Sequence, residues 1–394
     1  MTDSFIRFRE KQNIRTLELP NKEKYFCDIM MNIEHSFSGR IEGGNIINTF
    51  IMEASQQLIN SIILFEKGFF DCAYYSLRSA IEVSTIMVFL VDMPRDEQKK
   101  YFADWRDIKQ FPVQGQIIKM LADNGSIFAD MKEKMTLFFA NTKNLYQKLN
   151  KYVHKQGFKH FYVSRNHVLY SNQTLDIFIS NFIKHLKECI GVVAVMRLAA
   201  DPFPILLMDE EILLRCFDSM TDAYSQTFVD EYIGEEVIKT YKETELYKET
   251  YKSFIKEPKK NYATFNVMKY QYIDRNKMQD IIEQLYLLND YSRICVLMVK
   301  TCDKIVKIYI NGGPFFFFTE KETNRKATVW SSLDFDIFAQ NDVKFNQPYD
   351  EAYISVFQNN EISFFIEHNK QLTESDIRKI NETITREVET HTYD

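Results

Sequence analysis

Residues 71–91 read DCAYYSLRSAIEVSTIMVFLV, and this stretch decides the fold of the first half of the chain. It is apolar almost all the way round, as expected of a helix that is buried on every side. Arg78 and Glu82 are its only charges after the first residue. They leave a charge-free run, residues 83–91, that is too short for the ~20 apolar residues of a membrane-spanning helix. The stretch therefore predicts the central helix of a soluble bundle.

The sequence around this helix also has a pattern typical of helices. Apolar residues recur at spacings of three and four, and the whole chain contains only 11 glycines and 8 prolines. The helices expected from this pattern cover residues 45–66, 71–91, 95–109, 114–123, 127–152, 173–199, 209–233 and 235–255. We expect residues 1–256 to form an all-α helical bundle domain.

The sequence pattern changes from helical to strand-like after the polar segment EPKK at residues 257–260. Short runs rich in β-branched and aromatic residues follow, and the turn sequences Asn-Gly-Gly and Asn-Asn separate two pairs of them. Four consecutive phenylalanines, residues 315–318, suggest a strand that is buried on both faces. The pattern predicts a helix at 275–288, strands at 293–301, 304–310, 314–319, 327–333, 352–358 and 362–368, and a capped helix from Thr373 to about Glu389.

Residues 257–394 are thus expected to form a smaller α+β domain with an antiparallel β-meander and a C-terminal helix. Together with the helical bundle before it, this predicts a two-domain α+β protein. The boundary between the domains is expected near residues 256–262.

The composition excludes several classes of protein. The 394 residues are 45% hydrophobic and 26% charged, as in ordinary globular proteins, and the net charge of −6 argues against a non-specific binder of polyanions. The six cysteines are far apart and form no C-x-x-C pair, which argues against a zinc site or a disulfide framework. The first ten residues hold no apolar stretch of signal-peptide length, so we expect a cytoplasmic protein with no membrane partner.

The sequence also lacks the common cofactor and catalytic motifs. It contains no Walker A loop, G-x-G-x-x-G, H-E-x-x-H, G-x-S-x-G or EF-hand loop. Asp334 and Asp336 alternate on one predicted strand face, but no further metal ligands stand near them. We therefore expect neither a cofactor nor a metal ion.

From Lys134 to Leu175 the chain contains no Asp or Glu, although it contains seven Lys or Arg residues and three His residues among aromatic side chains. Cations between stacking rings suit a single-stranded RNA or nucleotide surface. Alternatively, this basic segment covers residues 209–257 of the same chain, which hold 13 acidic residues against 6 basic ones. The residues expected to bind RNA or its phosphates are Lys148, Lys151, Tyr152, Lys155, Lys159, His160 and Arg165.

Arg78, Glu82 and His154 are the candidates for catalysis. Arg78 and Glu82 lie one turn apart on the same face of the predicted helix, where the alternative is a plain salt bridge in the core. His154 stands at a helix end shortly before Gly157. An imidazole there can act as a general acid or base, or it can interact with the helix C-terminus.

Two segments carry a family resemblance. Residues 69–82, FFDCAYYSLRSAIE, are followed about seventy residues later by LYQKLNKYVH at residues 145–154. The pair resembles the "small-aromatic-x-x-L-R-x-x-x-E" helix and the later "L-x-x-Y-V-H" of large HEPN-like helical proteins of bacteria. The resemblance covers roughly residues 45–200 and leaves residues 257–394 unexplained.

The resemblance implies a helical bundle, usually dimeric, of the kind found in toxin–antitoxin and abortive-infection systems. Active members are metal-independent ribonucleases in which an Arg and a His, usually four to six residues apart, flank the scissile phosphate. Carried over, Arg78 and Glu82 match the first helix and His154 the later one. The helical domain departs from the family because it contains no Arg-x(4–6)-His motif, with the Arg before the His; the one match, from Arg386 to His391, is in the C-terminal tail.

Two functions remain open on these grounds. The first is a HEPN-like ribonuclease effector of phage defence or stress response, and it requires Arg78 and His154 to meet at an accessible surface. The second is a non-catalytic adaptor or sensor that forms a homodimer through the helical domain and binds a protein partner or small ligand through the α+β domain. The second predicts a buried Arg78–Glu82 pair and an exposed apolar patch.

Overall fold

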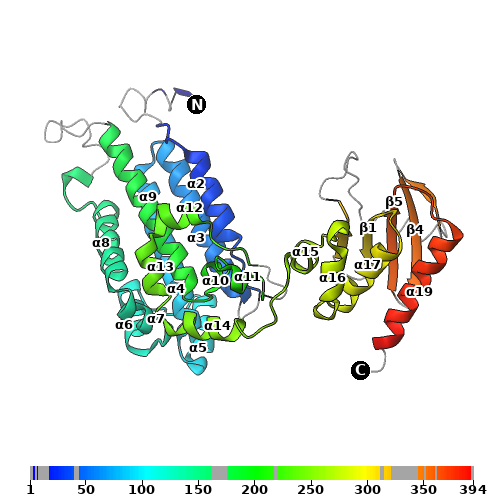
Figure 1. The fold of residues 1–394 in the computed structure, drawn as a ribbon. Helices are drawn as coiled ribbons and strands as arrows, with labels where there is room; N and C mark the ends of the chain where they lie inside the picture. Colours follow the sequence, from blue (N-terminus) through cyan, green and yellow to red (C-terminus); the bar gives the residue numbers. More distant parts are fainter. Residues whose placement is uncertain are drawn as a thin grey trace. The chain divides into compact units, whose positions relative to one another are not determined.

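The computed structural model describes residues 3–4, 7, 17–39, 44–160, 175–216, 221–310, 315–320, 345–349, 352–359 and 362–391. Two compact units make up the chain: residues 1–213 with 219–256, and residues 214–218 with 257–394 (Figure 1). The first unit is helical in its described part, and the second combines helices with an antiparallel sheet. The division after residue 256 coincides with the expected boundary, but the assignment of residues 214–218 to the second unit has no sequence signal.

Helix α4 (Phe70–Asp92) is the core helix of the first unit, as its sequence predicts. It packs against α3 (Gly44–Glu66), α8 (Thr136–Val153) and α9 (Leu175–Leu198). Within the described residues α4 alone is long and apolar enough to cross a membrane. Of its most apolar 18-residue segment, 61% is buried inside the protein. Its apolar surface is therefore the surface that the other helices cover.

Shorter helices complete the first unit. The other elements are α2 (Lys22–Asp28), η1 (Ile29–Glu34), α5 (Arg95–Arg106), α6 (Gln114–Asn124), α7 (Ile127–Lys134), α10 (Phe203–Leu206), α11 (Glu210–Leu213), α12 (Gln226–Phe228), η5 (Val229–Ile233), α13 (Glu235–Tyr241) and α14 (Glu245–Phe254).

Three of the helices predicted for the first unit are wrong, because each is divided into two or more elements in the structure. Residues 127–152 form α7 and α8, which are separated at the buried Met135.

Tertiary hydrogen bonds explain the other two breaks. The predicted helix at 209–233 is interrupted where Tyr224 donates its backbone N–H to Pro204 O at 2.9 Å and its hydroxyl to Ala194 O at 3.0 Å. The predicted helix at 235–255 is divided into α13 and α14, and Asp130 on α7 accepts the first N–H of α14, from Glu245, at 2.8 Å. Both partners lie far away in sequence, so local periodicity could not show them.

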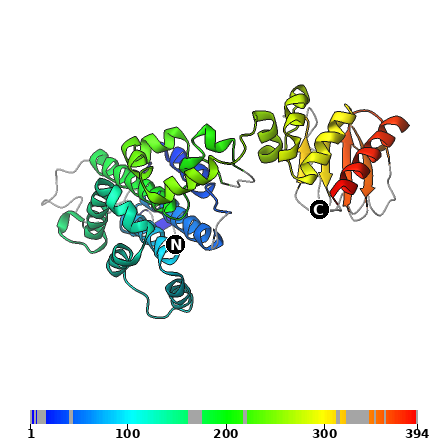
Figure 2. The ribbon, with the colours of Figure 1, turned by 60° about the horizontal axis from the view of Figure 1, so that its bottom comes forward.

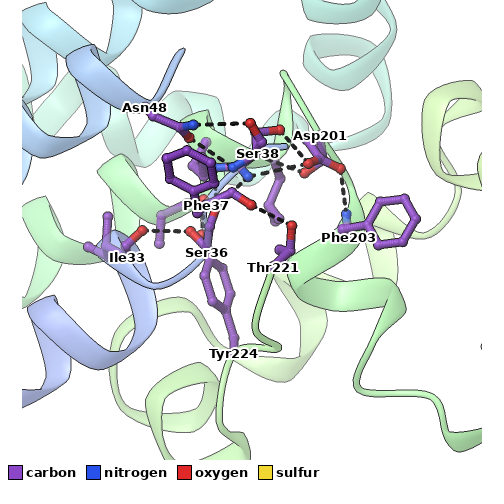
Figure 3. A network of polar contacts seen from close by, with 12 residues as sticks. Ile33, Ser36, Phe37, Ser38, Asn48, Asp201, Phe203, Thr221 and Tyr224 are labelled. Atoms are coloured by element: carbon purple, nitrogen blue, oxygen red, sulfur yellow. Dashed lines mark hydrogen bonds and ion pairs between the residues drawn. The ribbon is translucent and has the colours of Figure 1, made fainter. Parts of the chain in front are cut away.

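A buried polar network fixes residues 36–38, shortly after η1, against the end of α9 (Figure 3). The side chains of Arg197 and Asp201 are 0% and 2% exposed. Arg197 donates to the carbonyl oxygen of Ser36 from Nε at 3.1 Å and from Nη2 at 2.5 Å. Ser38 donates its hydroxyl to Asp201 at 2.6 Å, and Asn48 exchanges two hydrogen bonds with the backbone of Ser38. Both buried charges are thereby paired, as burial requires.

The second unit contains a five-stranded antiparallel sheet in the order β2-β1-β5-β4-β3. Helices α17 and α19 cover one face of it and share a core with β1 and β5 (Figure 2). The elements are α15 (Tyr262–Tyr270), η6 (Arg275–Lys277), α16 (Met278–Glu283), η7 (Leu285–Leu287), α17 (Asp290–Thr301), β1 (Ile305–Ile310), β2 (Phe315–Phe318), β3 (Gln347–Tyr349), β4 (Ala352–Asn359), β5 (Ile362–His368) and α19 (Glu374–His391).

Several predictions for this unit are confirmed. The expected strands at 304–310, 314–319, 352–358 and 362–368 correspond to β1, β2, β4 and β5, and both predicted hairpins pair in antiparallel fashion. The capped start of α19 is also present. Thr373 and Asp376 exchange hydrogen bonds between the side chain of each and the backbone N–H of the other, at 3.2 and 2.8 Å.

Other predictions for this unit are wrong. Residues 293–301 belong to helix α17, whose buried residues Ile294, Cys295 and Met298 follow helical spacing and whose N-terminus Asn289 caps. The predicted helix at 275–288 is α16 between two short 3-10 turns. The phenylalanine strand is buried on one face only, because Phe317 is 2% exposed while its neighbours on the other face are partly accessible. The predicted strand at 327–333 and the pair Asp334 and Asp336 lie outside the described residues.

Candidate functional site

Helices α4 and α8 run antiparallel, and polar contacts join α4 to α8 and to the two residues that follow α8. Each contact links a residue of α4 to a residue at least 64 positions later. The contacts are the ion pair Asp71–Lys155, Tyr75 Oη to Val153 O at 3.3 Å, Arg78 Nη1 to His154 Nε2 at 3.2 Å, and Tyr146 Oη to Glu82 Oε1 at 2.5 Å. The structure thus brings together the three catalytic candidates Arg78, Glu82 and His154.

Arg78 and Glu82 form a close ion pair. Arg78 donates from Nε to Glu82 Oε1 at 2.9 Å, and its Nη2 lies 2.8 Å from the same oxygen. The side chains are 22% and 27% exposed, so the pair is at the edge of the bundle and the alternative of a sealed core salt bridge does not hold. Although burial opposes the charge on Arg78, its hydrogen bond to Glu82 and the charge of Glu82 raise the pKa of the guanidinium.

His154 follows the last residue of α8 and is exposed. Its backbone N–H closes the helix on Asn150 O at 2.8 Å. Because a guanidinium has only donors, the imidazole Nε2 that faces Arg78 Nη1 must carry a lone pair, and the neutral ring then holds its proton on Nδ1. The site therefore places a basic nitrogen beside a permanent cation.

Tyr146 belongs to the site, although the sequence suggested it only as one aromatic residue of the acid-free segment. Its ring lies 5.5 Å from the guanidinium carbon of Arg78, and its hydroxyl donates to Glu82. Burial, followed by the hydrogen bond to Glu82, raises the pKa of Tyr146 to about 12. The spacing of Tyr146 and His154, eight residues or about two turns of one helix, was a signal that could have placed them on the same face.

The predicted RNA-binding lysines are placed differently from one another. Lys148 and Lys151 are exposed on α8. Lys155 is half-buried and ion-paired with Asp71, which supplies a carboxylate that the acid-free segment itself lacks. The side chain of Lys159 and the whole of Arg165 lie outside the described residues.

Tyr152 and His160, the two rings predicted to contact RNA, already contact other rings of the bundle. The ring of Tyr152 stacks on Tyr74 at 3.9 Å between centroids, and the ring of His160 lies nearly perpendicular to Tyr152 at 4.7 Å between centroids. His160 is 9% exposed, and its Nδ1 lies 2.6 Å from Gln156 O. Both side chains pack α8 onto the bundle and so place the end of α8 that carries His154.

His185 supports this packing from α9. Its Nδ1 lies 3.3 Å from the hydroxyl of Tyr74. Burial, then the charges of Lys148 and Lys184, lower the pKa of His185 to about 4, so the ring is neutral at physiological pH. A neutral buried histidine with a hydroxyl partner is a structural residue of the core.

A second Ser–His arrangement lies in the other unit. Ser355 Oγ is 2.8 Å from His368 Nε2, and His368 Nδ1 is 2.8 Å from Lys370 O. This geometry resembles that of an activated serine. Both side chains are 0% exposed, however, so no substrate reaches them and the pair connects β4 with β5.

The described residues offer few other places for chemistry. Among them no group of three His, Cys, Asp or Glu side chains could hold a metal ion. Cavities of about 820, 410 and 360 Å³ lie along α19, between α9 and η5, and beside α5, away from Arg78 and His154. The candidate site is therefore the open α4–α8 surface around the cation of Arg78, the imidazole of His154 and the carboxylate of Glu82. Comparisons with protein-family models, curated proteins and solved structures gave no significant match, so the function must be argued from this geometry.

Proposed function

We propose that this chain is a cytoplasmic, HEPN-like effector of bacterial phage defence or stress response, and that it cleaves RNA without a metal ion at the α4–α8 surface. One observation carries the proposal: Arg78 Nη1 and His154 Nε2 lie 3.2 Å apart although the residues are 76 positions apart in sequence. Neither residue is needed there for core packing, because His154 is exposed and Arg78 partly so. A cation beside an imidazole is the minimum equipment for phosphodiester cleavage by acid–base catalysis.

In this proposal the nucleophile comes from the RNA itself. His154 Nε2 takes the proton of a 2′-hydroxyl while that oxygen attacks the adjacent phosphorus. The bond from phosphorus to the 5′-oxygen breaks, and the proton returns to that oxygen. The products are a 2′,3′-cyclic phosphate and a 5′-hydroxyl. The step therefore requires neither an attacking water nor a metal ion.

Arg78 and the exposed lysines have separate roles in this scheme. The guanidinium of Arg78 stabilises the negative charge that accumulates on the phosphate oxygens in the transition state. Phosphate binding also draws Nη1 away from Nε2 of His154, which frees the lone pair that must accept the proton. Lys148 and Lys151 attract the RNA backbone, so binding is expected to weaken with salt.

The test is RNA cleavage by the purified protein in excess EDTA. The wild type is expected to cleave RNA, and His154→Ala to lose about 10²–10⁴-fold in rate, the usual contribution of a general acid–base group. His35→Ala is the matched control, because His35 is also exposed but pairs with Asp222 outside the site. An oligonucleotide with 2′-deoxyribose at every position should resist cleavage. Loss of wild-type activity in EDTA, or full activity of His154→Ala, contradicts the proposal.

The adaptor function is supported by a different feature. Tyr262, Tyr270 and Tyr286 on the helices of the second unit are 58%, 60% and 71% exposed, and exposed tyrosines are common at protein interfaces. The partial exposure of the Arg78–Glu82 pair, in contrast, is not what this function predicts. A stable dimer without ribonuclease activity, recorded by sedimentation in the same samples, would favour the adaptor.

A further inference from the structure

One oxygen of Glu82 receives every hydrogen bond that this side chain accepts in the described part of the chain. Arg78 reaches Oε1 through Nε at 2.9 Å and through Nη2 at 2.8 Å. Tyr146 donates its hydroxyl to the same oxygen at 2.5 Å. An arginine and a carboxylate commonly pair as two forks, with one N–H group on each oxygen. The concentration of all three donors on Oε1 therefore needs a cause.

Tyr146 supplies that cause. Its hydroxyl comes from α8, whereas Glu82 belongs to α4, so the hydrogen bond fixes Oε1 between two helices. The phenol remains protonated at physiological pH, because burial and then Glu82 raise the pKa of Tyr146. Its ring also lies at a cation–π distance, 5.5 Å, from Arg78. One side chain thus restrains both partners of the ion pair.

The restraint has a direction. With Nε and Nη2 of Arg78 engaged by Glu82, the remaining nitrogen, Nη1, is the one that faces His154. We propose that Tyr146 is a positioning residue that acts through Glu82 to aim Nη1 of Arg78 at His154, and hence at the phosphate between them. This inference rests on the proposed ribonuclease function and adds to it a residue that does not touch the substrate.

Tyr146→Phe tests the proposal because it removes only the hydroxyl. We expect kcat to fall about tenfold with little change in KM, since misplacing a group that acts in the transition state affects the chemical step. Tyr251→Phe is the matched control, a tyrosine on α14 outside the site. In an Arg78→Lys background, which lacks the guanidinium fork, Tyr146→Phe should cause almost no further loss, because the two residues then act on one pathway.

A second readout needs no RNA. The Nε–H resonance of Arg78 in the full chain should be sharp in the wild type and broadened in Tyr146→Phe. If wild-type protein does not cleave RNA, the ribonuclease proposal fails, and this resonance alone decides whether Tyr146 positions Arg78. If Tyr146→Phe does not fold, Glu82→Gln replaces it and is expected to lower kcat in the same way. Wild-type kcat in the variant, or an unchanged Arg78 resonance, overturns the inference.

Discussion

At the residue scale, the protein contains arginine–carboxylate pairs of identical spacing in opposite surroundings. Arg78–Glu82 and Arg197–Asp201 are both four residues apart on a helix. The first pair is at the bundle edge, with one guanidinium nitrogen left for His154. The second pair is fully buried, and its guanidinium donates hydrogen bonds to Ser36 and Asp201 through all three nitrogens. A donor that pairs only with an exposed imidazole at an accessible edge suits ligand binding, whereas a fully hydrogen-bonded buried network suits stability.

Arg197→Leu is therefore expected to destabilise the first unit strongly. The change leaves the Asp201 carboxylate buried without its counter-charge and the Ser36 carbonyl without its donors, which costs about 3–5 kcal/mol of unfolding free energy. Urea unfolding of the full chain measures this loss. Arg106→Leu is the control, because the Arg106 side chain is 63% exposed and its removal should change stability by less than about 0.5 kcal/mol. Equal effects of the two variants would contradict the structural role of the network.

At the element scale, close approach of backbones decides where glycine is required. Gly191 lies in the middle of α9, where glycine is about 1 kcal/mol less favourable than alanine. A Cβ at this position would lie 2.0 Å from the carbonyl oxygen of Tyr232 on η5. The helix therefore accepts a poor helix former so that η5 can pack directly on its backbone.

Gly191→Ala should consequently destabilise the protein by separating α9 from η5, although alanine is the better helix former. Gly115→Ala is the matched control within α6, because a Cβ there would meet nothing within 4 Å. That control should raise stability by up to about 1 kcal/mol. Thermal unfolding followed by circular dichroism measures both. A gain of stability in Gly191→Ala would show that the backbones are not in contact.

At the scale of the whole molecule, the second unit takes in residues that precede it by about forty positions. The backbone N–H of Lys260 donates to Leu214 O at 2.9 Å, and its ammonium donates to Cys216 O at 3.2 Å. Lys260 is 1% exposed and Cys216 is 5% exposed. A buried ammonium that loses a carbonyl acceptor is costly. Leu214 and Cys216 are therefore structural parts of the second unit.

A fragment of residues 257–394 should be less stable than the same unit within the full chain, by about 1–3 kcal/mol for the lost hydrogen bonds. Hydrogen exchange of the β4 and β5 amides, detected by mass spectrometry, measures the difference. We expect faster exchange in this fragment and slower exchange in a fragment of residues 214–394, which keeps Leu214 and Cys216. Identical exchange in both fragments would show that Leu214 and Cys216 do not stabilise the second unit.

Local patterns in the sequence determined much of this protein. The apolar helix α4, the change of sequence pattern at residue 256, four strands and the capped start of α19 all follow from interactions between neighbours a few residues apart. The family resemblance, together with residue chemistry, selected Arg78, Glu82 and His154, which the structure brings into one polar cluster. Periodicity failed where β-branched residues such as Val296 and Val299 occur in a helix, α17, that the core buries.

Only the tertiary structure decided which distant groups meet. The hydroxyl of Tyr146 on Glu82, the carboxylate of Asp71 on Lys155, and the carbonyl of Tyr232 over Gly191 join residues 41 to 84 positions apart. The tertiary structure also packs Tyr152 and His160 against other side chains of the bundle. It buries Arg197 but leaves Arg78 partly exposed at the bundle edge. The physical reason is that burial and hydrogen-bond partners depend on how helices pack, and no spacing within one helix carries that information.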